Sequence, residues 1–224
     1  MDLKAIKENY NLLIKDINFD KLDLELKNPN IFQILKISNT EIRHSNFLSW
    51  LLDPLQSHKL GDIFLKRFLR EVFSSEIFNQ LDQVDVESMS LSNVEIYREW
   101  KNIDILIVMK DIIVCIENKI LSKEHSSQLK RYREIIEKNF PNYKKTFVYL
   151  TPFGDLSENE SDNYASISYE FIVETLDRII NVYGNSLNNL VKIYIKDYVT
   201  ILKRELMKTD ESIELSKKIN QNHK

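Results

Sequence analysis

The clearest hydrophobic pattern lies in the middle of the chain, in the segment REWKNIDILIVMKDIIVCIENK from Arg98 to Lys119. Ile103 to Met109 and Ile112 to Ile116 are short apolar runs rich in β-branched residues, which is typical of strands buried on both faces. Lys110-Asp111 between them is predicted to be a two-residue turn, although it lacks the Asn-Gly or Asp-Gly that favours such turns most strongly. We therefore expect a buried β-hairpin.

The turn sets which residues of the two strands face each other. Counting outward from it, Met109 faces Ile112 and Asp104 faces Glu117; opposed side chains have Cβ atoms roughly 4.5–5.5 Å apart. Lys119 lies two positions after Glu117, so both point to one face. A buried carboxylate pair is tolerated when a cation lies between the two groups or when one is protonated. Asp104, Glu117 and Lys119 thus outline a site for a divalent metal beside a lysine.

Helical spacing dominates the chain before the hairpin. The expected elements are a helix over Asp2 to Ile17, a short apolar turn over Ile31 to Ile37, a helix from Ser38 or Thr40 to the proline stop at Asp53-Pro54, and a helix over Asp62 to Phe78. Val94 to Tyr97 is either a further strand or the first half of the hairpin strand.

A second helical region follows the hairpin. We expect a helix over His125 to Phe140, a strand over Thr146 to Leu150, a loop over Asp155 to Asn163, helices over Tyr169 to Tyr183 and Leu187 to Met207, and a frayed polar end from Thr209. This order predicts an α/β or α+β fold in which a mixed sheet is flanked by helices.

Length and composition limit the class of protein. The 224 residues are 43% hydrophobic, enough for a single domain over 1–224, with its core at about 38–154 and C-terminal helices at about 168–208. The formal net charge of −3 argues against a protein coated in positive charge, but it does not exclude a local basic groove. The single cysteine, Cys115, permits no intramolecular disulfide, and no apolar run reaches the roughly 18 residues of a membrane span, so we expect a cytoplasmic protein.

The hairpin residues also resemble those of a known family. Asp104 in an apolar strand, followed by Glu117-Asn118-Lys119 at the end of the next, resembles the pattern of the PD-(D/E)XK nuclease superfamily, which has the restriction-endonuclease-like fold. Glu41 in TEIRHSNFLSWLLDP, Gln128 and Tyr132 in QLKRY, and the strand ending YLTPFG extend the resemblance, which covers roughly Glu41 to Gly154.

The resemblance implies a fold and an activity. The fold is a restriction-endonuclease-like α/β core, a central mixed sheet flanked by helices, with extra N- and C-terminal helices. The activity is Mg²⁺- or Mn²⁺-dependent hydrolysis of the phosphodiester bonds of DNA, with RNA as the alternative, in phage defence or DNA processing. A catalytically inactive nucleic-acid- or protein-binding module that kept the fold is the rival interpretation.

The resemblance also implies roles for individual residues. Asp104, Glu117, Lys119 and Gln128 would be catalytic, and Glu41, Asp104 and Glu117 would hold the metal, since Mg²⁺ prefers oxygen ligands. For Lys119 we favour positioning of water or phosphate over proton abstraction. Expected substrate contacts are Arg43, His44, Lys123, Lys130, Arg131 and Tyr132.

Structural alternatives exist for most of these residues. Lys119 could form a structural ion pair, and Ser38-x-x-Glu41 matches a capping box that would hold Glu41 at its own helix start. His44 could be a helix-packing residue, and Gln128 and Tyr132 could be ordinary residues of an amphipathic helix. Glu99 is expected to point away from Asp104 by simple strand alternation, unless a bulge intervenes.

Partners follow from the same argument. Basic residues around the hairpin exit and the next helix would grip nucleic acid, although such a run is more often a solvated face: Lys119, Lys123, Lys130, Arg131 and Arg133, with Lys144 and Lys145 beyond. No zinc-finger spacing or helix-turn-helix signature accompanies them. A homodimer, or a partner protein that supplies specificity, is therefore left open, and no membrane partner is expected.

Overall fold

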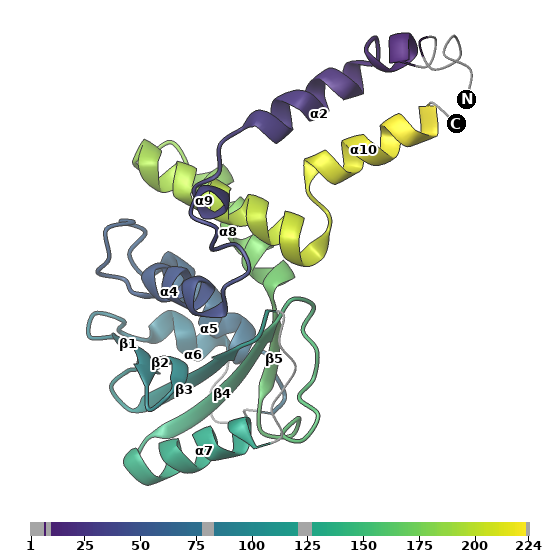
Figure 1. Cartoon of the computed structure of the whole chain (residues 1–224). Helices are drawn as coiled ribbons and strands as arrows, with labels where there is room; N and C mark the ends of the chain where they lie inside the picture. Colours follow the sequence, from purple (N-terminus) through teal and green to yellow (C-terminus); the bar gives the residue numbers. More distant parts are fainter. Residues whose placement is uncertain (1–6, 8–9, 78–82, 121–126, 223–224) are drawn as a thin grey trace.

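A five-stranded sheet forms the centre of the computed structural model, which describes residues 7, 10–77, 83–120 and 127–222 (Figure 1). The strands lie in chain order: β1 (Glu95–Trp100), β2 (Ile103–Val108), β3 (Ile112–Asn118), β4 (Lys144–Thr151) and β5 (Ala165–Ser168). The first three are antiparallel and the last three are parallel, so the sheet is mixed, as expected. The crossover between β3 and β4 contains α7 (Gln128–Asn139).

The predicted hairpin is present with the predicted register. Val108 pairs with Ile113, and the Met109 N–H donates to the Ile112 carbonyl at 2.9 Å across the Lys110-Asp111 turn. Every residue of β3 is buried, which explains why the sequence shows a continuous apolar run rather than alternation.

β1 is a strand of its own rather than the first half of β2. The tight turn at Lys101 and Asn102, which separates the two, was not predicted. Trp100 pairs with Ile103 across Lys101 and Asn102, whose φ angles are 52° and 65°. Two consecutive positive φ values are the mark of a type I′ turn, which matches the twist of paired strands. Glu99 therefore belongs to β1, not to the strand of Asp104.

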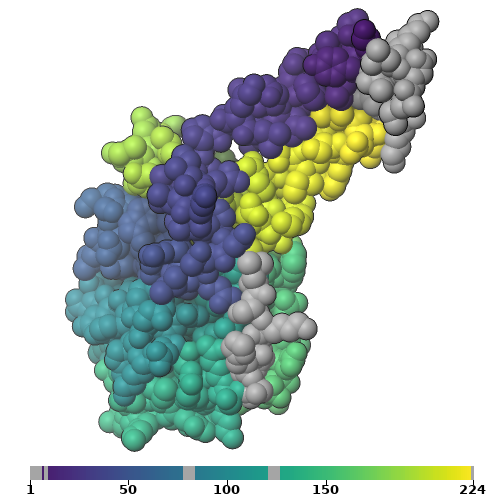
Figure 2. Space-filling view, viewed as in Figure 1, coloured from purple at the N-terminus to yellow at the C-terminus, as the bar shows by residue number. Residues whose placement is uncertain are grey.

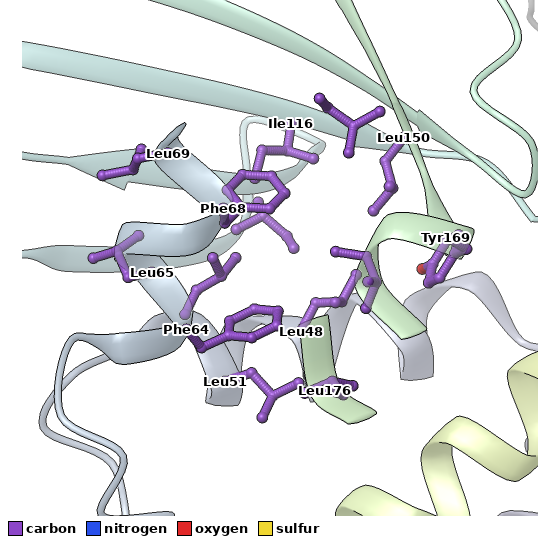
Figure 3. Packing of buried hydrophobic residues seen from close by; sticks show 14 of the residues in the cluster. Leu48, Leu51, Phe64, Leu65, Phe68, Leu69, Ile116, Leu150, Tyr169 and Leu176 are labelled. Atoms are coloured by element: carbon purple, nitrogen blue, oxygen red, sulfur yellow. The ribbon is translucent and has the colours of Figure 1, made fainter. Parts of the chain in front are cut away.

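Helices cover both faces of the sheet. α4 (Glu41–Leu52), α5 (Ile63–Val72), α8 (Tyr169–Tyr183) and α9 (Asn189–Ile201) lie on one face, and α7 lies on the other (Figure 1). Figure 3 shows the core between these helices and the sheet, with Phe68 of α5 near Ile116 of β3 and Leu51 of α4 near Phe64. The apolar face expected for α5 is fully inside this core: Phe64, Leu65, Phe68, Leu69, Val72 and Phe73.

The chain ends form a pair of helices that project from the body. α2 (Ile17–Lys27) and α10 (Glu211–Asn222) contact each other along their length (Figures 1 and 2). The expectation of a frayed end from Thr209 was wrong, because Leu215 and Ile219 share one face of a helix and are buried. The expected helix over Asp2 to Ile17 lies partly outside the described residues, and α2 begins where it was predicted to end.

Shorter elements complete the chain. α3 (Ile31–Ile34) matches the expected short turn, whereas α6 (Gln83–Ser88) and β5 were not predicted. The helix expected over Leu187 to Met207 is α9 followed by a π-helical stretch, η1 (Leu202–Met207). The predicted start of α7 at His125 lies outside the described residues. In the part of the chain that the structure describes, no helix is long and apolar enough to cross a membrane.

Candidate active site

Three predicted residues meet where β2 begins and β3 ends. The register that pairs Ile105 with Ile116 continues to place Asp104 opposite Glu117. Lys119 follows β3 directly, and its Nζ lies 2.8 Å from Oε1 of Glu117. Glu117 is 0% exposed and Lys119 is 6% exposed, so both ionisable groups lie inside the protein.

The Glu117 carboxylate is incompletely satisfied. Within the described residues, neither of its oxygens accepts a hydrogen bond of good geometry, although Oε1 touches the Lys119 ammonium. Burial, and then the neighbouring Asp104 carboxylate, raise the pKa of Glu117 to about 8. A second cation beside Glu117 would relieve this cost.

The same surroundings shift the pKa values of Asp104 and Lys119. Burial raises the pKa of Asp104, although the N–H of Asn118, which donates to its Oδ2 at 2.8 Å, opposes the rise. Burial alone would lower the pKa of Lys119, but the carboxylates of Glu117, Glu41 and Asp104 together outweigh it, so that pKa lies above its ordinary value. Lys119 therefore stays protonated near neutral pH.

Asn118 fixes the strand end from the opposite face. Its Nδ2 donates to Oγ of Ser45 on α4 at 2.8 Å, and its Oδ1 accepts from the Tyr169 hydroxyl of α8 at 2.8 Å. Asn118 is 0% exposed and uses its backbone N–H to hold Asp104. The sequence analysis did not predict this set of Asn118 hydrogen bonds. Its one sign in the sequence was a polar residue between Glu117 and Lys119.

Glu41 reaches the same strand end from the helix before the sheet. It is the first residue of α4, with Thr40 as N-cap, so Ser38 and Glu41 do not occupy the N-cap and N3 positions of a capping box. Its Oε1 accepts the Ile120 N–H at 3.0 Å, and its charge raises the pKa of Lys119. Glu41 thus borders the site on the lysine side.

The expected three-carboxylate metal set is not assembled. Across the described residues, no three His, Cys, Asp or Glu side chains are gathered closely enough to hold a metal ion. Asp104 and Glu117 nevertheless fit a Mg²⁺ ion, which commonly uses one or two carboxylates and keeps several waters. The unsatisfied Glu117 oxygens are the observation that supports this fit.

Gln128 and Tyr132 lie on the other side of the site, on α7. Gln128 Nε2 donates to the Tyr132 hydroxyl at 2.8 Å, and that hydroxyl donates to the carbonyl of Asn102 in the β1–β2 turn. Oε1 of Gln128 is buried and has no hydrogen-bond partner in the described structure. The charges of Glu117 and Asp104 raise the pKa of Tyr132, after burial, which places this pair near the carboxylates.

Glu99 corrects a prediction. Because the turn at Lys101 and Asn102 separates the strands, Glu99 is level with Asp104 on the adjacent strand rather than turned away by alternation. Its carboxylate raises the pKa of Asp104, while Arg98 beside it lowers that pKa and donates to Glu99 Oε1 at 3.1 Å. Glu99 and Arg98 are residues of the site margin that sequence reasoning missed.

His44 is a packing residue, one of the two alternatives considered for it. It is 1% exposed; its Nε2 lies 2.7 Å from the Ser38 carbonyl and its Nδ1 lies 3.3 Å from the Tyr198 hydroxyl. Burial lowers the pKa of His44, which favours the neutral ring. Both ring nitrogens are engaged, so this histidine does not face a substrate.

The basic residues expected to contact the substrate lie in different surroundings. Arg43 and Lys130 are exposed, Arg131 is exposed and places its guanidinium 5.3 Å from the Tyr132 ring centroid, and Lys123 lies outside the described residues. Arg133 is occupied by Glu160, at 3.2 Å, and by Glu137. Lys144 and Lys145 begin β4 at the opposite end of the sheet, so they do not belong to the site.

The hydrogen bonds of Asn118 lead to a stability prediction. Tyr169→Phe should lower the free energy of unfolding by about 1–3 kcal/mol, because it leaves the buried Asn118 Oδ1 without its donor. Tyr194→Phe, at a side chain that is 41% exposed, is the matched control. Equal denaturant midpoints for the two variants would show that the Tyr169–Asn118 hydrogen bond does not stabilise the fold.

The raised pKa of Glu117 predicts a pH dependence of stability. Between pH 4.5, the ordinary pKa of Glu117, and about pH 8, Glu117 keeps its proton in the folded protein but has lost it in the unfolded chain. The stability of the metal-free protein therefore falls as pH rises through this window. Glu117→Gln removes this loss, and its melting temperature in EDTA should rise relative to wild type from pH 5 to pH 8. The exposed Glu134→Gln should show no such trend; parallel pH profiles for wild type and Glu117→Gln would refute the shift.

Comparisons with known proteins identify the family of the chain. No curated protein and no solved structure matches the chain. The sequence model of the PD-(D/E)XK nuclease superfamily matches residues 29–200, a span that contains the sheet and every residue of the site. The chain therefore belongs to the PD-(D/E)XK nuclease superfamily.

Proposed function

We propose that this protein is a metal-dependent nuclease that hydrolyses phosphodiester bonds of DNA, with Asp104, Glu117, Lys119 and Gln128 as its catalytic residues. The observation that carries the proposal is the buried, unsatisfied Glu117 carboxylate opposite Asp104 and beside Lys119. A structural ion pair alone does not require a second buried carboxylate there, since like charges disfavour each other.

Asp104 and Glu117 would hold one Mg²⁺ or Mn²⁺ ion. When bound, the ion supplies Lewis-acid stabilisation of phosphate charge and lowers the pKa of its water. The chain holds the two carboxylates in place before the ion arrives: the β2–β3 register sets their spacing, and the Asn118 N–H orients Asp104. Such preorganisation avoids reorganisation during the reaction.

Lys119 acts as a positioning cation rather than a base. Its raised pKa keeps the ammonium charged, and the contact of 2.8 Å with Glu117 fixes its position. A protonated lysine can donate to a non-bridging phosphate oxygen and offset the charge that develops there. Glu41 helps to hold the lysine charged from the α4 side.

Gln128 offers a hydrogen-bond acceptor to the reacting water. Its amide nitrogen is bound to the Tyr132 hydroxyl, which leaves Oε1 as the unpaired atom of this side chain. An acceptor fixed in this way can orient an attacking water, and correct orientation of the reacting groups lowers the barrier to hydrolysis. Tyr132 therefore acts through Gln128 as a positioning residue.

Cleavage is the direct test. With Mg²⁺ or Mn²⁺, wild type should cut linear, circular or single-stranded DNA, and Asp104→Asn and Lys119→Ala should each be about 10²–10³-fold slower, because each loses preorganised charge stabilisation. Asp111→Asn and Lys110→Ala, in the turn at the far end of the same hairpin, should cut like wild type.

Either of two outcomes would contradict the proposal that the protein is a nuclease. One is the absence of cleavage of every DNA form and of RNA; the other is unchanged cleavage by Asp104→Asn and Lys119→Ala. Calorimetric titration with Mn²⁺ separates the rival binding module: binding that is lost in Asp104→Asn favours the nuclease, whereas no binding by wild type favours the inactive module.

A further inference from the structure

A groove between α5 and α8 carries an uneven set of charges. Its volume is about 410 Å³, and the arginines Arg67, Arg70 and Arg178 line it together with Glu71. Phe171 and Val182 form apolar parts of its wall. For a chain whose net charge is −3, this is a local concentration of positive charge.

The packing of α5 explains why the arginines gather there. α5 buries Phe64, Leu65 and Phe68 in the core, where Figure 3 shows Phe68 near Ile116 of the sheet. Arg67 and Arg70 are three residues apart, so they are neighbours on another side of the same helix. α8 packs beside α5 and contributes Arg178 from its solvent-exposed side.

Two carboxylates accompany the three arginines: Glu71 lines the groove and Glu87 pairs with Arg70, so a positive excess remains. Arg70 forms an ion pair with Glu87, but its buried Nε has no hydrogen-bond partner among the described residues. Arg67 and Arg178 make no ion pair or side-chain hydrogen bond with any described residue. Elsewhere, Arg98, Arg133 and Arg204 are held by carboxylates.

The groove differs from the catalytic site in place and in chemistry. Arg178 lies nine residues along α8 from Tyr169, which is about 13 Å along the helix axis. Tyr169 touches Asn118 behind the carboxylates, so α8 joins the two places. The catalytic site concentrates carboxylates, whereas the groove concentrates guanidinium groups.

We propose that this groove binds the phosphate of a nucleotide, with the arginines on the phosphate and the base against Phe171 and Val182. Guanidinium groups bind phosphate oxygens through paired N–H donors, which suits this ligand better than an uncharged one. The volume lies within the roughly 300–1,000 Å³ of small-ligand sites. The phosphate comes either from a free nucleotide or from the nucleic-acid strand, and only the second source rests on the proposed nuclease function.

Binding without metal tests the groove separately from cleavage. Wild type and the double variant Arg67→Ala/Arg178→Ala are titrated in EDTA with inorganic phosphate, AMP and a fluorescent six-nucleotide thymidine oligomer. The double variant should bind at least about tenfold more weakly, because it loses charge-assisted hydrogen bonds. For the oligomer, its salt dependence should also be shallower by about one to two in log–log slope. Lys110→Ala/Lys138→Ala removes two exposed positive charges elsewhere and is the matched control.

Each outcome has a defined meaning. Binding of AMP or inorganic phosphate that is lost in the double variant supports a free ligand, and binding of the oligomer alone, weakened in the double variant, supports the substrate strand. Equal binding by the double variant and wild type, or no binding of any probe to wild type, overturns the proposal. All titrations are made in EDTA, where no metal-dependent cleavage occurs, so failed cleavage and a failed groove remain distinguishable.

Discussion

Burial of the Glu117 carboxylate is the constraint on which the site depends. Removing an ion from water costs several kcal/mol even after the protein relaxes. Here the carboxylate faces Asp104, and among the described residues its ion-pair partner is Lys119, at 2.8 Å from Oε1. A core built for stability alone would place apolar side chains at this strand end. The surrounding structure therefore has to hold the charges in place, and a bound cation would recover part of the cost.

The two faces of the sheet share that task. On the side of α4 and α8, Ser45 and Tyr169 hold Asn118, whose backbone in turn holds Asp104. On the side of α7, Gln128 and Tyr132 bind each other and the β1–β2 turn. The strand end is thus fixed by elements more than 70 residues before it and more than 50 residues after it, as the spacings of 73 and 51 residues in the Asn118 bonds show.

Local rules predicted the hairpin but not its surroundings. A two-residue turn and the period of two along a strand were enough to oppose Asp104 and Glu117. Glu99 was misplaced because the turn at Lys101 and Asn102 contains no glycine, although both residues adopt positive φ. Contacts such as Tyr169 with Asn118 join distant segments, and no local pattern encodes them. The polar composition of α10 likewise concealed the few apolar positions that hold it against α2.

The central claim is that Asp104 and Glu117 share a divalent ion. Crystals of the protein soaked with Mn²⁺ and measured at the manganese absorption edge would test it most directly. The account predicts one anomalous peak between these two carboxylates and its loss in Asp104→Asn crystals. Anomalous density elsewhere in wild type, with none between Asp104 and Glu117, would contradict it.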